Sequence, residues 1–311
     1  PCFIFQMWSM IGLFIIRLDG APKFAMWCNI VPGILNVLLD WIFIFPLGMG
    51  VEGAAIATSI SISIGGFMAL GYLLCRAKDL KLIRLKMSAK SIALAFRNVG
   101  YHCRIGSSTL LGELALAVMF YVGNRVFMHY LGDTGVGAYG IACYYMPFFF
   151  MVGNSIAQSA QPIISYNYGI DRWTRIVEAR KVLLMTCLGF GVAVSLIFIL
   201  FPKGLVGLFI PIESEAAIIA INGFPLLSIG ILFFILNVAI IGYYQSVERM
   251  GKATLYVFLR GFVFIVPCFL ILPKFLGTVG IWLAMPASEL LTSLFIALSV
   301  LPSRLKSLRK R

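Results

Sequence analysis

The chain has 311 residues, of which 61% are hydrophobic and only 12% are charged, and its mean hydropathy is +0.98. An ordinary soluble domain carries about 25% charged residues, so this chain lacks the polar surface that a water-soluble protein needs. The composition excludes a soluble enzyme or a cytosolic binding module. It favours a polytopic membrane protein, in which each crossing takes roughly 20 apolar residues.

The formal net charge is +13, and the positions of the basic residues along the chain indicate a membrane topology. Nucleic-acid-binding proteins gather basic residues on one exposed face, whereas the Lys and Arg residues here form short clusters between apolar runs. We therefore expect no nucleic-acid partner. The seven cysteines are scattered without a CxxC pair, which indicates packing residues rather than a disulfide framework or a zinc site.

Eight apolar runs are long enough to span a membrane. In chain order they are 24–46, 53–75, 106–130, 138–165, 182–201, 217–243, 253–273 and 277–301. The run 1–16 is also apolar but shorter, and it starts at Pro1 with neither an initiator Met nor a basic segment before it. We interpret it as the end of a helix and the chain as a fragment, not as a signal peptide.

The basic residues alternate strictly between the two sides of these spans. All fall on one side except Arg125, Lys203 and Lys274. Because loops rich in Lys and Arg stay in the cytoplasm, the basic side, which includes 76–104 and the C-terminus, is predicted to be cytoplasmic in the inner membrane of a bacterial-type cell.

The predicted domain organisation follows from the loops. Residues 1–75 form one part of a helical bundle, 105–302 form a second bundle of six helices, and 303–311 form a basic tail. Between the bundles, 76–104 carries apolar residues such as Leu80, Ile83 and Phe96 among eight basic ones, which predicts an amphipathic linker on an anionic membrane surface. A merely solvated basic loop is the alternative.

An internal repeat relates 20–58 to 251–285. Lys23 matches Lys252, and the pair Gly50/Gly53 has the same spacing as Gly277/Gly280. Both copies start on the predicted cytoplasmic side, so the repeat is parallel, and transporters with such repeats bind substrate where the repeats meet. The matched copies would be the last spans of two related halves. Because 106–301 contains six spans, two halves of six helices are expected.

Two segments carry a resemblance to a known family. RLDGAPKFAMWCNIVPGILNVLLDWIFIFPLGMGVEGAAIAT (17–58) resembles helices four to six of the multidrug and toxic compound extrusion (MATE) transporters, and SAQPIISYNYG (159–169) resembles the end of their eighth helix. The resemblance implies an all-α membrane protein of two six-helix lobes, with the first lobe truncated and the second complete. It also implies a monomeric antiporter that exchanges H⁺ or Na⁺ for bulky organic cations and needs no cofactor.

Asp40 has the strongest functional case among the carboxylates inside the spans. Asn36 lies four residues earlier on the same helical face, and Thr58 reaches a similar depth from the next span, about 8–15 Å below the outer surface. A carboxylate, an amide oxygen and a hydroxyl at one depth suit a proton or a transiently bound Na⁺. The same three residue types form a cation site in one branch of the resembled family. A structural hydrogen-bond network is the alternative.

Two further carboxylates lie deep in apolar spans. In another branch of the family, a Glu on the helix that corresponds to that of Glu113 couples transport. The acidic residue of that branch on a later helix has no counterpart here, because the closest position is Asn237. Glu289 could face a central substrate cavity together with Asn154, Gln158 and Asn237, although each amide is often only a link between helices. Arg125 and Arg260 are expected to extend toward a membrane interface.

Three functions are open at this point. The leading one is a cation-coupled multidrug efflux antiporter. A flippase for lipid-linked oligosaccharides would need a basic cavity, for which only Arg125 and Arg260 are candidates, and a membrane scaffold without transport would not need carboxyls inside its spans. A membrane enzyme is not expected, because the sequence has no HExxH, DDxxD or G-x-S-x-G motif.

Overall fold

The computed structural model describes residues 2–78, 80 and 88–308, with side chains described up to residue 299. Within these ranges every regular element is a helix. The chain divides into two compact units, Pro1–Ala93 and Leu94–Arg311. The division falls inside the predicted linker 76–104, of which residues 79 and 81–87 lie outside the described residues.

Unit 1 contains three long helices, α1 (Cys2–Leu18), α2 (Pro22–Ile44) and α3 (Gly50–Cys75), each packed against the other two. Glycines allow this close packing. A Cβ on Gly66 would lie 2.6 Å from the carbonyl oxygen of Phe5, and one on Gly12 would lie 2.7 Å from the Cβ of Ala69. Small residues at helix contacts are the usual means by which helices associate in lipid, where no hydrophobic driving force between helices exists.

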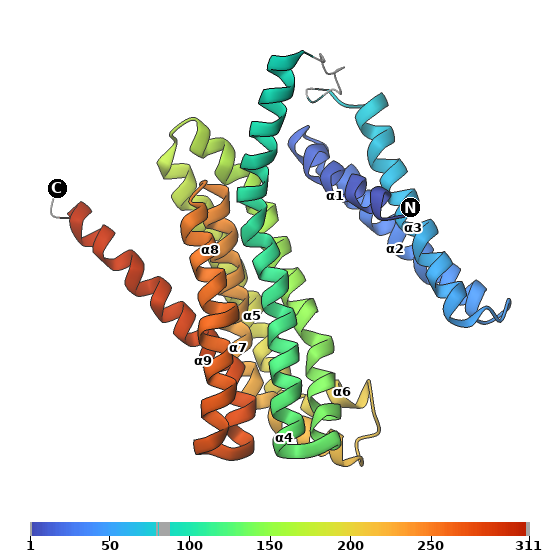
Figure 1. Ribbon diagram of the computed structural model, residues 1–311, viewed down its shortest axis with the longest axis vertical. Helices are drawn as coiled ribbons and strands as arrows, with labels where there is room; N and C mark the ends of the chain where they lie inside the picture. The colour runs from blue at the N-terminus through green and yellow to red at the C-terminus, as the bar shows by residue number, and fades with distance from the viewer. Residues whose placement is uncertain (1, 79, 81–87, 309–311) are drawn as a thin grey trace. The chain divides into compact units, whose positions relative to one another are not determined.

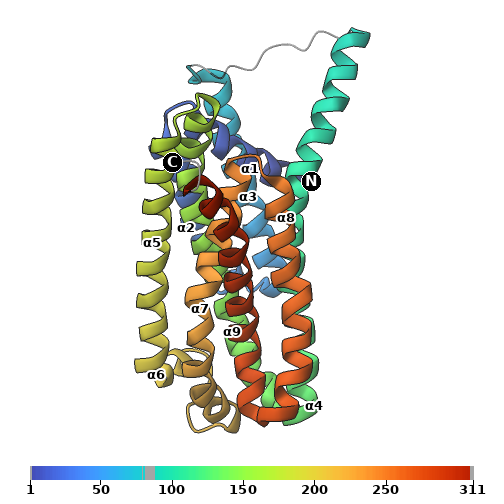
Figure 2. The same cartoon turned by 90° about the vertical axis from the view of Figure 1, so that its left-hand side faces the viewer.

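Unit 2 is a bundle of long helices (Figures 1 and 2). Its elements are α4 (Ala89–Gly169, whose first residues belong to unit 1), α5 (Trp173–Leu200), α6 (Pro202–Gly207), α7 (Glu215–Ser246), α8 (Met250–Phe258), the π-helix η1 (Leu259–Phe264) and α9 (Ile265–Leu308). Both α4 and α9 consist of two helices, joined at Gly132 and Gly277. With these divisions, the helices of spanning length match the eight predicted spans.

Three turns share one glycine arrangement. Gly50, Gly132 and Gly277 have φ values of 56°, 63° and 56°, in the left-handed region that favours glycine. In each case a second glycine follows three residues later, at Gly53, Gly135 and Gly280, where a Cβ would meet the preceding helix. The first and last pairs belong to the predicted internal repeat, whereas Gly132/Gly135 was not predicted. Figures 1 and 2 show the turn within α4 and the turn within α9 at the same end of unit 2.

Alanine at Gly277 is expected to lower the stability of unit 2 by about 1–3 kcal/mol, because the left-handed conformation is strained for any residue with a Cβ. Gly189 provides a matched control, since it lies within α5 and has open space around its Cα. Alanine there is expected to be neutral or stabilising. Thermal melting of the two purified variants in detergent measures the difference, and equal melting temperatures would contradict the prediction.

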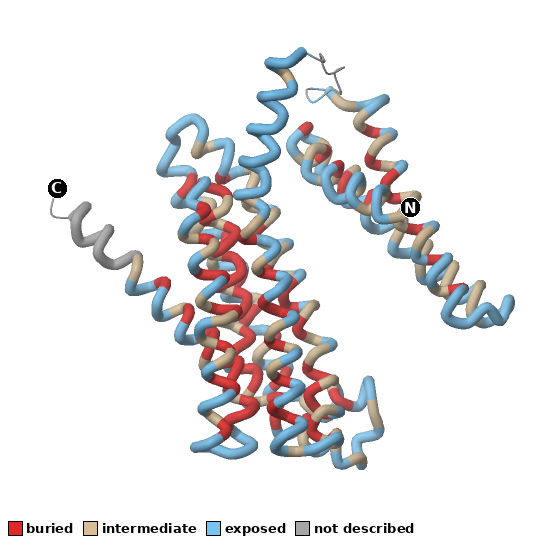
Figure 3. Tube along the Cα trace, viewed as in Figure 1, coloured by how far each residue is buried: buried red, intermediate tan, exposed pale blue. Residues whose placement is uncertain are grey.

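The core of unit 2 is rich in aromatic residues. Phe198 stacks on Phe224 with ring centroids 5.0 Å apart, and Trp282 meets Phe127 edge to face at 5.0 Å. Gly223 leaves the space that the Trp282 indole occupies. Figure 3 shows the buried residues of unit 2 gathered along the inner sides of its helices, which leaves apolar side chains such as Leu188 and Leu196 on the outside, as a lipid solvent requires.

Asp19 forms hydrogen bonds with the segment that follows α3. It is only 5% exposed, and its carboxylate accepts hydrogen bonds from the Tyr72 hydroxyl at 2.8 Å and from the backbone N–H groups of Lys78 and Leu80 at 3.0 Å. No role was predicted for Asp19, because it lies at the end of a span. Its position in the motif RLDG, directly after α1, is the signal that could have found it.

Replacing Asp19 with alanine is expected to speed amide hydrogen exchange at Lys78 and Leu80 by tenfold or more, since two buried acceptors are lost. Tyr72→Phe removes one side-chain donor but leaves both backbone bonds, so it should change exchange much less. Exchange followed by mass spectrometry on the peptide that covers 76–80 checks both variants. Unchanged protection in Asp19→Ala would show that other contacts hold this segment.

Candidate functional site

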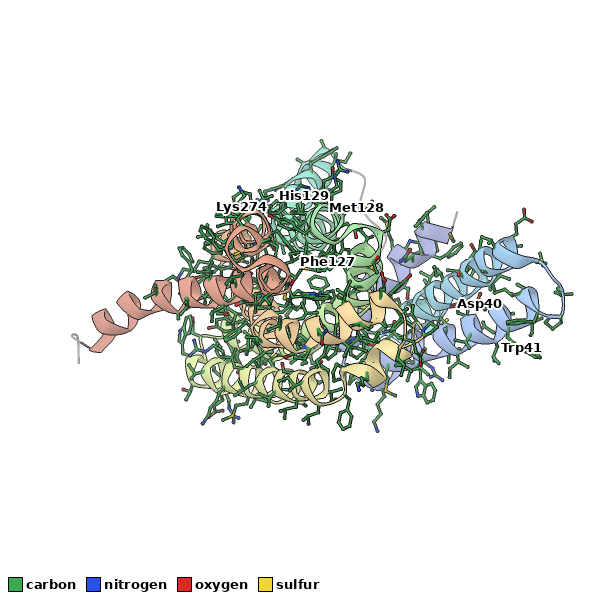
Figure 4. The ribbon with its side chains drawn as sticks, turned by 90° about the horizontal axis from the view of Figure 1, so that it is seen from below. Asp40, Trp41, Phe127, Met128, His129 and Lys274 are labelled. Atoms are coloured by element: carbon green, nitrogen blue, oxygen red, sulfur yellow. The ribbon has the colours of Figure 1, made fainter. Side chains whose placement is uncertain are left out.

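Asn36 and Thr58 lie side by side in unit 1. The Asn36 amide nitrogen on α2 is 3.4 Å from the Thr58 hydroxyl oxygen on α3, and the Thr58 hydroxyl donates to the carbonyl oxygen of Ala54 at 2.9 Å. The chain reverses between the two helices at 45–49, so residues at equal distance from the turn meet. Asp40, labelled in Figure 4, follows Asn36 by one helical turn.

The carboxylate of Asp40 is incompletely satisfied. Its Oδ1 atom is buried and has no hydrogen-bond partner among the residues that the structure describes. A charged oxygen without a partner is costly in an apolar environment. Proton uptake or binding of a hard cation would relieve that cost, and the oxygens of Asn36 and Thr58 are further possible ligands. The arrangement can therefore hold a small positive charge reversibly.

Glu113 lies in unit 2, on the first helix of α4. It is exposed on the surface of this unit. Ala115, two residues later, faces η1, where a Cβ on Gly261 would meet its side chain. Because residues two apart point to nearly opposite sides of a helix, Glu113 faces away from η1.

Arg260 and Glu289 form a buried ion pair inside unit 2. The Arg260 Nε atom is 2.6 Å from Glu289 Oε1, and the two residues are 5% and 3% exposed. The guanidinium also lies 4.0 Å from the centre of the Phe234 ring. The expectation that Arg260 extends to a membrane interface was wrong, because a carboxylate and an aromatic face within the bundle stabilise its charge there. Arg125 is exposed, as that expectation requires.

Asn237 completes this buried cluster. Its amide nitrogen donates to Glu289 Oε2 at 2.8 Å and to the Glu289 carbonyl oxygen at 2.9 Å, while its own oxygen accepts from the Ser293 hydroxyl at 2.9 Å. Both carboxylate oxygens of Glu289 thus have donors. The structure brings together Glu289 and Asn237, two residues predicted for the substrate cavity, and places them in a satisfied network that links α7, η1 and α9.

The turn that carries Arg260 is the only π-helix among the described elements. Insertions of this kind occur often at functional sites and leave a backbone carbonyl without its helical partner. Here the Ser288 hydroxyl donates to the Arg260 carbonyl oxygen at 3.3 Å. The pairing of Arg260 with Glu289 was not predicted, although an arginine within an apolar span must find a counter-charge.

Asn154 and Gln158 lie on the second helix of α4, four residues apart and therefore on one face. Both are half-buried, and their side chains form no hydrogen bond with the described part of the chain. They differ in this respect from Asn237. Free amides at this place can bind a polar substrate group. Among the described residues, no hydrogen bond joins either amide to Glu289.

Solved structures share the fold of this chain. It superposes with a TM-score of 0.84 and 21% identity on an outward-facing multidrug resistance MATE family transporter of the MOP superfamily, covering 97% of this chain and 67% of that one. A MOP superfamily transporter from Pyrococcus furiosus, whose binding pocket is described as having reverse polarity, gives 0.82 at 20% identity over 94% and 66%. The all-helical, MATE-like fold expected from the sequence is thereby confirmed.

Sequence relatives agree with the structures. The multidrug export protein MepA of Staphylococcus saprophyticus is 26% identical over 91% of this chain, and MepA of Staphylococcus aureus is 24% identical over 91%. The chain spans about three fifths of the length of these relatives, as the match covers 61% of each. The MatE family model matches residues 109–270, which is more than half of the chain. This multi-span membrane protein therefore belongs to the MatE family.

Proposed function

We propose that the chain acts in a secondary active transporter that exports organic cations and other drugs in exchange for H⁺ or Na⁺. The observation that carries this proposal is the buried, unpartnered Oδ1 of Asp40, one helical turn from Asn36 and its neighbour Thr58. Such a group can take up an ion from one side of the membrane and release it on the other. Multidrug export is also the activity named for the MepA relatives.

The coupling step is proposed to centre on Asp40. Binding of H⁺ or Na⁺ neutralises the carboxylate, which favours a repacking of α2 and α3 and lowers the affinity for the drug. Asn36 and Thr58 would share the ion, and Glu113 is the candidate for a second coupling group in unit 2. Asn154 and Gln158 are the candidates for contacts with the substrate.

The charge of unit 2 argues against a flippase for lipid-linked oligosaccharides. Such a protein would need free cations in its cavity to bind a pyrophosphate. Arg260 was one of two candidates, and the structure engages it with Glu289 at 2.6 Å inside a closed network. Arg125 is then the one remaining candidate for binding the pyrophosphate. This favours export of organic cations over movement of a lipid-linked oligosaccharide.

The proposed location is the inner membrane of a bacterial cell, with 76–104 and the C-terminus in the cytoplasm. Support comes from the asymmetric placement of Lys and Arg and from the staphylococcal relatives. Cysteine-labelling with a membrane-impermeant reagent at Cys103, which is exposed, tests the orientation. Labelling in inverted vesicles but not in whole cells is expected.

The function is tested by expressing two proteins in drug-sensitive cells. One is the chain itself, and the other is a chimera in which staphylococcal MepA supplies the segment that the chain does not match. Ethidium efflux is followed in membrane vesicles with an imposed H⁺ or Na⁺ gradient. Efflux that depends on one gradient is expected, and it names the coupling ion. Absence of efflux under either gradient from correctly inserted chimera would overturn the proposal.

A further inference from the structure

A groove lies between α5 and α7 near the N-terminal end of α5. It encloses about 540 Å³, within the range of about 300–1,000 Å³ that small-molecule sites occupy. Arg180 and Lys181 line one end, and Leu184, Leu188 and Leu236 line the rest. The groove is thus basic at one end and aliphatic along its length.

The basic end is placed to meet lipid headgroups. Arg180 and Lys181 lie seven and eight residues after Trp173, where α5 begins, about 10–12 Å along the helix axis. Helical side chains point back toward the N-terminus, so both charged groups reach toward the membrane interface. The Arg180 guanidinium lies 5.5 Å from the centre of the Tyr243 ring on α7, which fixes it at the mouth of the groove.

The aliphatic part begins one helical turn after the basic residues. From Leu184 to Leu188 it follows α5 for about 6 Å, which is long enough for the part of an acyl chain next to the headgroup. Met185 and Leu188 are 60% and 47% exposed, so the groove opens sideways toward the bilayer. Leu236 and Ile240 on α7 form its other wall.

A second groove on the other side of α5 gives an internal comparison. It lies between α4 and α5, encloses about 420 Å³ and is also largely apolar. Its one basic lining residue, Arg175, is 3.7 Å from Glu178 in the same groove, so its charge is compensated. None of the described residues that line the groove between α5 and α7 is acidic. Charge therefore distinguishes two grooves of similar size.

We infer that the groove between α5 and α7 binds an anionic phospholipid, with the phosphate at Arg180 and Lys181 and one acyl chain along Leu184 and Leu188. Basic pockets between transmembrane helices bind such headgroups elsewhere. A bound lipid would fill a gap between two helices of the bundle that otherwise exposes aliphatic side chains. The inference concerns lipid binding alone and is independent of what the protein transports.

Native mass spectrometry of the purified chain tests this inference with phosphatidylglycerol and phosphatidylcholine of identical acyl chains. Phosphatidylglycerol is expected to be retained about tenfold more than phosphatidylcholine, and the double variant Arg180→Gln/Lys181→Gln should lose about that factor. The matched control Arg172→Gln/Arg175→Gln removes the same charge from the same end of α5 outside the groove. It should change retention less than about twofold.

A second pair of variants tests the acyl-chain part while leaving all charges in place. Leu188→Trp fills the groove and should reduce phosphatidylglycerol retention, whereas Leu196→Trp, on the exposed surface of α5 beyond the groove, should not. Equal retention of the two lipids by the unmodified chain would overturn the inference. Undiminished binding in Leu188→Trp, or an equal loss in the matched charge control, would overturn it as well.

Discussion

Asp40→Asn is expected to abolish gradient-driven drug efflux while leaving membrane insertion intact. Asparagine keeps the size and polarity of the side chain but can neither take up a proton nor supply a negative charge to Na⁺. Because Oδ1 of Asp40 is buried without a hydrogen-bond partner among the described residues, the substitution removes no hydrogen bond at that atom. The expected loss is at least about 100-fold in the gradient-dependent rate, as for removal of a group that acts in every cycle.

Glu52→Gln is the matched control for this variant. Glu52 lies in the first turn of α3, in the same unit, and its side chain is exposed. Its replacement removes the same charge without touching a buried group, so efflux should stay within about twofold of the unmodified rate. Asn36→Ala and Thr58→Ala should give intermediate rates, because each removes one neutral ligand. If the Asp40→Asn variant exports drug as fast as the unmodified protein, the proposal that Asp40 couples transport is wrong.

The fold could be predicted from the sequence because one physical constraint dominates it. Every backbone group inside lipid must be bonded internally, so long apolar runs become helices, and basic clusters mark one side. The contact between Asn36 and Thr58 was predictable in the same way, since two helices joined by a tight turn bring residues of equal depth together. The role of these residues in coupling stays a prediction.

Contacts that depend on side-chain packing could not be predicted from composition or spacing. Arg260 and Glu289 are 29 residues apart in different helices, and their pairing depends on how the helix after Gly277 rotates about its axis. Asp19 was missed for another reason: the groups of Lys78 and Leu80 that donate to it are backbone N–H groups, which leave no mark in the sequence. The third glycine turn, Gly132/Gly135, was missed because it lies outside 20–58 and 251–285, the two copies of the predicted repeat.

Breaking the buried ion pair is expected to destabilise unit 2 strongly. Arg260→Met leaves the Glu289 carboxylate uncompensated at 3% exposure, and such a loss costs about 3–5 kcal/mol. The melting temperature in detergent should fall on the order of 10 °C. Arg125→Met is the control, because Arg125 is exposed and its replacement should leave the melting temperature nearly unchanged.

The double variant Arg260→Met/Glu289→Leu separates a structural role from a role in substrate binding. Replacing both partners of a buried ion pair by apolar residues is often neutral or stabilising, since the desolvation cost of two charges disappears. The double variant should therefore recover most of the lost melting temperature. If Glu289 only links α7, η1 and α9, the double variant should recover drug efflux together with its melting temperature. If Glu289 contacts the exported cation, as the sequence suggested, the double variant stays folded and inactive.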